Sequence, residues 1–242
     1  MKRLLCMLFA LLLCTGCAGA EQAFPLLDAP LEGNLSNAHS AYELIWILPQ
    51  LQETDEAASA INRFYAEFEN SLKAGDFLLE DEWDELDEGF HAELSYAMTY
   101  ADEHYVCFAL TLMSTAGNGE NAVLWADTFA LDGLYAGQKV GLSQLLGLEE
   151  DKADENSQTL AAQLATKLVW QIVSQESQNP DGDYLDGLTE EQVQNAFIPE
   201  QDFYLDADGN VVFFIQSGEI AGEIAGILEY PFSVAELLSA VK

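Results

Sequence analysis

The sequence predicts an α+β fold, and three observations lead to that prediction. Two long segments carry apolar residues three or four positions apart, which is the period of a helix. Several other segments alternate polar and apolar residues with the period of a strand. The strands follow one another in runs, which favours an α+β arrangement over a doubly wound sheet. We therefore expect antiparallel meander sheets packed with two long helices and a short C-terminal helix, in two small α+β subdomains.

The charge excludes one class of partner. The 242 residues include 42 Asp and Glu but 8 Lys and Arg, so the formal net charge is −34. A nucleic-acid surface needs clustered cations, which this chain cannot supply. Because half of the residues are hydrophobic, the chain has enough apolar material for a folded core despite its charge.

Residues 1–20 are predicted to be an export signal. Lys2 and Arg3 precede an apolar run from Leu4 to Cys14, which is too short to span a membrane comfortably. No later run approaches the length of a transmembrane helix. Residues 1–20 hold two cations and no acid, so the exported form has a net charge of 6 − 42 = −36.

Two cleavage sites compete. In the favoured one, small residues flank Cys17, whose thiol receives a lipid that anchors the protein to the extracytoplasmic face of a membrane. In the alternative, cleavage follows Ala20 and the protein is secreted free. Membrane contact is expected only through the lipid at Cys17.

Residues 21–40 are rich in Pro, Gly, Ser and Asn and are predicted to be a linker. A strand follows at 42–48. Thr54 is predicted to cap a helix that ends at Gly75. Strands are then expected from His91 to Tyr100, from Tyr105 to Met113 and from Val123 to Leu131, which completes a first module at 41–133.

The second module is predicted at 134–242. Its long helix places apolar residues on one stripe from Leu160 to Ile172. Capping boxes are expected at Thr189 with Gln192 and at Ser233 with Glu236. A hairpin turn at 206–209 joins strands at 203–205 and 211–215, and a last strand ends at Phe232.

No catalytic or cofactor-binding motif is found, and we expect neither an enzyme nor a cofactor. Three of the four cysteines lie in the export signal, so Cys107 is left as a buried structural thiol. The histidines His39, His91 and His104 are interpreted as solvated or hydrogen-bonded side chains, so no metal site is predicted.

Two acidic segments remain. Seven acids fall within nine positions with Trp83 among them, which favours a solvated surface and also fits a docking patch for a basic protein. The residues of this patch are Glu80, Asp81, Glu82, Trp83, Asp84, Glu85, Asp87 and Glu88. Asp181, Asp183 and Asp186 are similar to part of a calcium loop, but Leu185 stands where a ligand is expected.

Several strings in the sequence match a known pattern. The first is Ile47-Leu48-Pro49-Gln50-Leu51 followed by Ala60-Ile61-Asn62. The second is Thr128 to Gly133 with Leu142 to Leu146 after it, and the last are Phe203-Tyr204-Leu205, Val212-Phe213-Phe214 and Tyr230-Pro231-Phe232. The first string resembles the start of the extracellular region of the anti-sigma factor RsiV and of the module that precedes the catalytic domain of PdaC-type polysaccharide deacetylases. The second resembles the start of a C-terminal domain of unknown function, and the resemblance covers residues 42–242.

The resemblance implies binding and not catalysis, since the RsiV region recognises lysozyme, a basic protein. We expect an exported, sensor-like envelope protein whose partner is a basic extracellular protein of the lysozyme kind. One alternative is an enzyme acting on cell-wall polysaccharide, or an accessory to one, which requires exposed aromatic side chains around paired acids. Another is a structural envelope domain stabilised by calcium.

Overall fold

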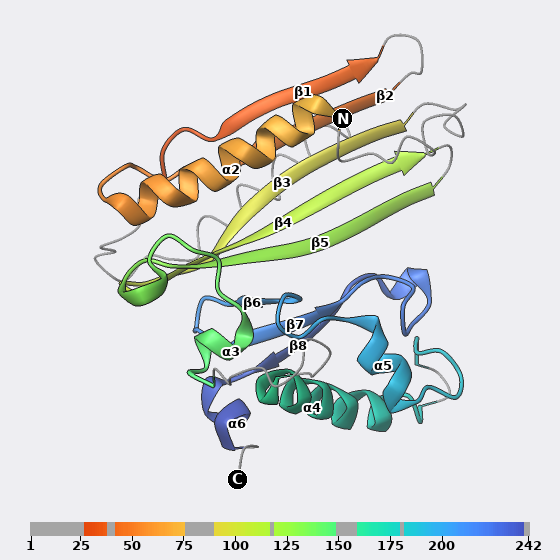
Figure 1. The fold of residues 1–242 in the computed structure, drawn as a ribbon. Coiled ribbons are helices and arrows are strands. Elements are labelled where there is room, and N and C mark those ends of the chain that lie inside the picture. Colours follow the sequence, from red (N-terminus) through yellow and green to blue (C-terminus); the bar gives the residue numbers. More distant parts are fainter. Residues whose placement is uncertain are drawn as a thin grey trace.

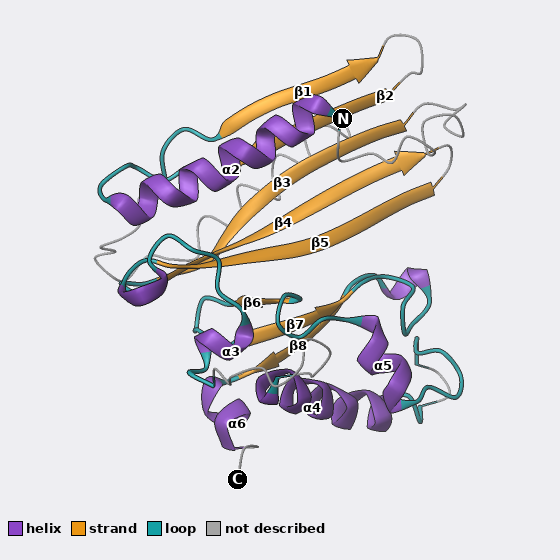
Figure 2. Cartoon of the chain, in the orientation of Figure 1, coloured by secondary structure: helices purple, strands orange, loops and turns teal. Residues whose placement is uncertain are grey.

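The fold was taken from a computed structural model, which describes residues 27–37, 42–75, 90–116, 119–148, 159–179 and 182–239. It is α+β, as predicted, with a five-stranded sheet, a three-stranded sheet and several helices. Figure 1 shows α2 running along the larger sheet between β1 and β3, with the smaller sheet next to β5 and α4 beyond the smaller sheet. Figure 2 shows α3, α4, α5 and α6 grouped around the smaller sheet.

The larger sheet has the strand order β1-β2-β3-β4-β5. Its strands are β1 (Leu31–Asn37), β2 (Tyr42–Leu48), β3 (Phe90–Ala101), β4 (Tyr105–Ala116) and β5 (Gly119–Ala130). Strands β3, β4 and β5 form the predicted antiparallel meander. Strands β2 and β3 instead pair in parallel, so the sheet is mixed. The helix α2 (Glu56–Ala74) lies between them in the chain, and a parallel pair requires such a crossover.

Strand β1 corrects one prediction. Residues 31–37 lie in the segment predicted to be a linker, yet they pair antiparallel with β2 along its whole length. The apolar residues of β1 are too few to show the alternation of a strand, and its pairing depends on β2. Gly33 lies opposite Trp46, and a Cβ atom at Gly33 would come within 2.2 Å of the Trp46 ring. Glycine is therefore required there by the close approach of the indole.

The start of α2 differs by one residue from the prediction. Asp55, and not Thr54, is the N-cap, because its carboxylate accepts the backbone N–H of Ala58 at 2.8 Å. The Thr54 hydroxyl donates to Asp55. At the other end Gly75 adopts φ of 80°, the left-handed conformation that ends helices, as predicted.

The smaller sheet has the order β6-β7-β8 and is antiparallel. Its strands are β6 (Phe203–Leu205), β7 (Val211–Ile215) and β8 (Leu228–Phe232). The helices of this part are α3 (Leu142–Leu145), α4 (Leu160–Glu176), α5 (Glu190–Ala196) and α6 (Val234–Ser239), with 3-10 turns at η2 (Gly133–Tyr135) and η3 (Glu223–Ala225). The hairpin turn at 206–209 and both predicted capping boxes are confirmed.

Two apolar clusters form the core. One lies between α2 and the larger sheet and includes Trp46, Tyr65 and Phe108. The other lies between the smaller sheet and α4 and also includes Cys107 from β4. The division of the chain at residue 133 stays a prediction, since the second cluster extends into the larger sheet.

Cys107 lies where the two sheets meet. It is fully buried, as predicted, and its sulfur accepts the hydroxyl of Thr128 and the backbone N–H of Leu205. Burial raises the pKa of its thiol, so the group stays neutral. Nearby, Phe214 of β7 packs with Leu124 and Ala126 of β5. The smaller sheet thus covers part of the face of the larger sheet that lies opposite α2.

A buried amide links α2 to the chain that precedes it. The side chain of Asn62 accepts the N–H of Leu51 and donates to its C=O, both at 2.8 Å. Both residues are buried, so neither backbone group has water as an alternative partner.

We predict that Asn62→Ala lowers the free energy of unfolding by about 2 to 4 kcal/mol, because two buried backbone groups lose their partners. Asn70→Ala, at an exposed position of the same helix, is the control and should change it by less than about 0.5 kcal/mol. Urea unfolding measures both. Equal effects in the two variants would contradict this role of Asn62.

Candidate functional site

The site residues predicted from sequence fall outside the described residues. These are the lipidation site Cys17 and the acidic patch from Glu80 to Glu88. Asp181 of the calcium-like loop also lies outside them. In the described part of the chain no group of three or more His, Cys, Asp or Glu side chains is placed to hold a metal ion. Nor does a helix there have the length and apolarity needed to span a membrane.

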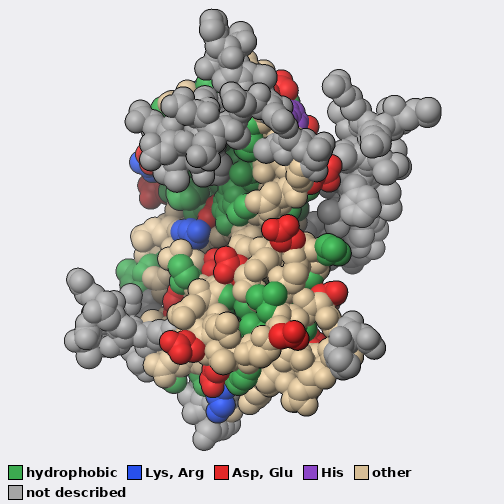
Figure 3. Space-filling model, turned by 90° about the vertical axis from the view of Figure 1, so that its right-hand side faces the viewer, with side chains coloured by type: hydrophobic (Ala, Val, Ile, Leu, Met, Phe, Trp, Pro, Cys, Tyr) green, Lys and Arg blue, Asp and Glu red, His purple; other side chains and the backbone are tan. Residues whose placement is uncertain are grey.

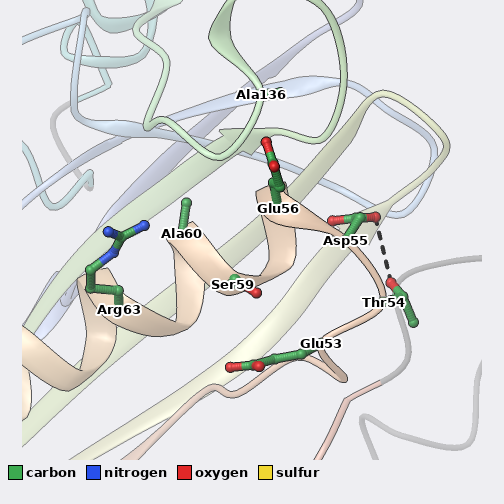
Figure 4. Close-up of a pocket in the computed structure, with 8 residues that line it drawn as sticks. All are labelled: Glu53, Thr54, Asp55, Glu56, Ser59, Ala60, Arg63 and Ala136. Carbon is green, nitrogen blue, oxygen red and sulfur yellow. Dashed lines mark hydrogen bonds between the residues drawn. The ribbon is translucent and has the colours of Figure 1, made fainter.

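An open pocket of about 600 Å³ lies at the start of α2. Its charged lining residues are Glu53, Asp55, Glu56 and Arg63. Figure 4 shows Glu56, Ala60 and Arg63 pointing from α2 toward the loop that carries Ala136. The Asp55 carboxylate already caps α2, and Glu53, Glu56 and Arg63 are exposed. The pocket can therefore contact solvated cations but does not exclude water from a reaction.

The buried carboxylate of the described residues is Asp127, on the α2 side of β5. It accepts the hydroxyl of Tyr65 at 3.0 Å and pairs with the ammonium of Lys139 at 2.6 Å. Burial, followed by the nearby Asp127 charge, raises the pKa of Tyr65 well above its usual value. Tyr65 is therefore neutral and donates its hydroxyl hydrogen to Asp127. The cluster of Tyr65, Asp127 and Lys139 connects α2, β5 and the loop before α3.

Glu200 performs a similar structural task in the C-terminal part. Its carboxylate accepts the backbone N–H of Ser143 at 2.9 Å and the hydroxyls of Ser143 and Thr159. Ser143 lies in the first turn of α3, and Thr159 is the N-cap of α4. A carboxylate is favourable beside helix N-termini, so Glu200 joins the beginnings of two helices.

Both described histidines are bound to acids on the surface. The ring nitrogens of His91 each lie 3.1 Å from a carboxylate oxygen, one of Glu43 and one of Glu93. His104 lies 2.9 Å from Asp132 and 3.5 Å from Glu103. The hydrogen bond to Asp132 and its charge raise the pKa of His104 above the usual value, against a smaller opposing effect of desolvation. These contacts agree with the prediction for His91 and His104, whereas His39 lies outside the described residues.

The tryptophans give no aromatic groove in the described part of the chain. Trp46 is fully buried, and Trp125 and Trp170 are half-buried against the apolar clusters. The polysaccharide alternative requires exposed aromatic rings beside paired acids, and these three residues do not provide them.

Cations are few on the described surface, and two of the four are paired with acids. Lys73 pairs with Glu69 at 2.8 Å, and Lys139 pairs with Asp127. Arg63 and Lys167 are exposed on α2 and α4. Figure 3 shows that red acidic side chains outnumber blue cations on the face it presents. The candidate functional feature is therefore an acidic surface.

The comparisons with known proteins concern the fold. No family model matches the chain, and no curated protein matches it. A solved structure of a DUF3298 family protein from Pseudomonas aeruginosa has a TM-score of 0.53 at 11% identity, over 89% of this chain and 94% of that one. A DUF3298 family member from Bacteroides fragilis has a TM-score of 0.46 at 12% identity, over 89% of this chain and 98% of that one.

The chain is similar in fold to the Pseudomonas protein over nearly its whole length. DUF3298 is the domain of unknown function shared with RsiV-like proteins. The fold expected from the resemblance is thus supported in that coarser form.

Sequence reasoning missed the polar clusters around Asp127 and Glu200. Asp127 follows the apolar run from Ala122 to Ala126, in a part of β5 whose residues are buried on both faces. An acid in such an apolar run is a usable signal for a paired buried charge. Glu200 follows Pro199 in a loop, and no local pattern connects it with Ser143 or Thr159.

We predict that Asp132→Asn lowers the pKa of His104 toward its usual value of about 6.5. Since the folded-state pKa is raised, protonated His104 stabilises the fold below pH about 6.5, and this stabilisation is lost as the pH rises through the folded-state pKa. Titration of the His104 ring protons by NMR measures the change. An identical midpoint in both proteins would show that Asp132 does not cause the shift.

Proposed function

We propose that the protein is an exported, non-enzymatic binding protein of the cell envelope, and that it recognises a basic extracellular protein such as lysozyme. The observation that carries this proposal is the imbalance of its surface charge. The whole chain has 42 acids and 8 cations. Among the described carboxylates Asp127 is the one that is buried, so the others remain available on the surface or partly exposed.

This charge favours encounter with cationic proteins. Opposite net charges raise association rates, and patches of one sign select partners of the other sign. At an ionic strength of 0.15 M the Debye length is about 8 Å, so distant charges contribute little to the affinity there. Specific recognition therefore needs close contacts in addition to attraction at long range.

The fold likeness to a DUF3298 protein is compatible with this function. It supports the RsiV-like architecture from which the lysozyme hypothesis comes. The export signal and the lipid anchor at Cys17 belong to the same proposal, since a partner outside the cytoplasm requires export.

We predict that the purified chain binds lysozyme at 0.15 M salt with a dissociation constant that rises by less than about tenfold between 0.05 and 0.15 M. Dissolved salt screens the long-range attraction between net charges but weakens contacts at short distance much less. Isothermal titration calorimetry measures the affinity, and polylysine is the control for nonspecific attraction. No association at 0.15 M, or binding no tighter than that of polylysine, would contradict specific recognition of lysozyme.

For the anchor, we predict that the mature N-terminus is a lipid-modified Cys17. Mass spectrometry of the protein isolated from its own envelope tests this. An unmodified N-terminus at Glu21 would show that the protein is secreted without a lipid anchor. That result would not affect the proposal of a basic partner.

A further inference from the structure

Within the described part of the chain, no helix or sheet covers one half of a face of the larger sheet. Side chains alternate between the two faces of a sheet, and Leu44, Trp46 and Leu94 of β2 and β3 point into the core on the α2 side. Their strand neighbours therefore point to the opposite face. On β4 and β5 that opposite face is covered near Cys107 and Ala126 by the smaller sheet.

The strand register shows which side chains gather on the uncovered half. One row crosses the sheet through paired positions on all five strands, Asn34, Ile45, Glu93, Met113 and Ala122. The row beside it consists of Ser36, Glu43, His91, Thr115 and Glu120. On the other side of the first row, Glu32, Ile47, Ser95 and Thr111 lie on β1 to β4. We call these three rows the open sheet face.

The open sheet face carries an acid at its centre, apolar side chains beside it and further acids toward its edges. Glu93 on the middle strand β3 lies between Ile45 of β2 and Met113 of β4 in the first row. Met113 is 45% exposed, Ile47 is 39% exposed and Ile45 is half-buried. The acids of this face are Glu32, Glu43, Glu93 and Glu120, all exposed. Its basic side chain is His91, which is held by Glu43 and Glu93. The described Lys and Arg residues lie instead on α2, on α4 and in the loop before α3.

We propose that the open sheet face is the docking surface for the basic protein partner, a proposal that rests on the function proposed above. Interfaces combine apolar contacts with complementary charges, and here exposed apolar side chains lie next to exposed carboxylates. A partner that fits this face presents apolar side chains interspersed with Lys or Arg. Such a partner covers Ile45, Ile47 and Met113 and pairs its cations with Glu93 at the centre and with the acids nearer the edges.

A second copy of this chain does not fit the same surface. Two copies in symmetric contact present the same patch to each other, so the four acids of one would face the four acids of the other. Like charges in contact oppose association, and the chain as a whole carries −34. Charge complementarity thus selects a cationic partner over self-association.

The size of the face sets its role in the interface. Strands are about 4.8 Å apart and alternate residues about 6.6 Å, so the three rows span roughly 19 by 13 Å, or about 250 Å². A standard interface buries about 800 Å² on each partner. The open sheet face is therefore the centre of the contact and not its full extent.

Two sets of variants test this surface against lysozyme as the probe. The first replaces three acids of this face, Glu43→Gln, Glu93→Gln and Glu120→Gln. The control makes the same change of charge at exposed acids elsewhere, Glu53→Gln, Glu67→Gln and Glu219→Gln. A third variant, Ile47→Ser with Met113→Ser, leaves the net charge unchanged. Circular dichroism and the urea midpoint establish that each variant is folded before binding is measured at 0.15 M salt.

We expect the dissociation constant to rise at least tenfold in the first and third variants and less than twofold in the control. An equal loss in the two Glu→Gln sets, or unchanged affinity in the first and third variants while the parent chain binds, overturns this docking surface but leaves the proposed function standing. If the parent chain does not bind lysozyme at all, the proposed function fails, and the docking surface fails with it.

Discussion

The five-stranded sheet has two faces, and the rest of the structure depends on how each is covered. A sheet that buries apolar side chains on one face needs a second layer there. The single long helix α2 supplies that layer for Trp46, Leu94 and Phe108. On the opposite face the smaller sheet covers the region around Cys107 and Ala126. The rest of that face, over which no described element lies, keeps polar and acidic residues beside a few apolar ones, as a surface in contact with water or with a partner must.

Buried polar groups hold these layers in position. Asn62 fixes the chain before α2, and the cluster of Tyr65, Asp127 and Lys139 joins that helix to β5 and to the loop that leads into the C-terminal part. Glu200 joins the beginnings of α3 and α4. Their partners lie 11 to 62 positions away in the sequence and belong to other segments of the fold. Each group therefore connects separate elements of the structure.

Local signals in the sequence predicted much of the fold. The capping boxes at Thr189 and Ser233 and the glycine that ends α2 are features of single segments, and each is confirmed. Strand β1 could not be predicted in this way, because its pairing with β2 and the contact of Gly33 with Trp46 are tertiary. The parallel pairing of β2 with β3 likewise depends on the path of α2.

The acidic character of the candidate site was readable from composition, but its geometry was not. Alternation along β2 places Glu43, Ile45 and Ile47 on one face of the sheet and Leu44 and Trp46 on the other. The alternation does not show which of the two faces another layer covers. The position of the smaller sheet, set by contacts such as that of Phe214 with Leu124, decides this.

The most direct test of the account is to map the carboxylates that a bound basic protein protects. Carboxyl groups of the chain are labelled with a carbodiimide and an amine, with and without saturating lysozyme, and the label at each residue is quantified by mass spectrometry. The account predicts protection of Glu43, Glu93 and Glu120, while Glu53, Glu67 and Glu219 react equally in both samples. Protection confined to the second group, with the first still reactive, would contradict it.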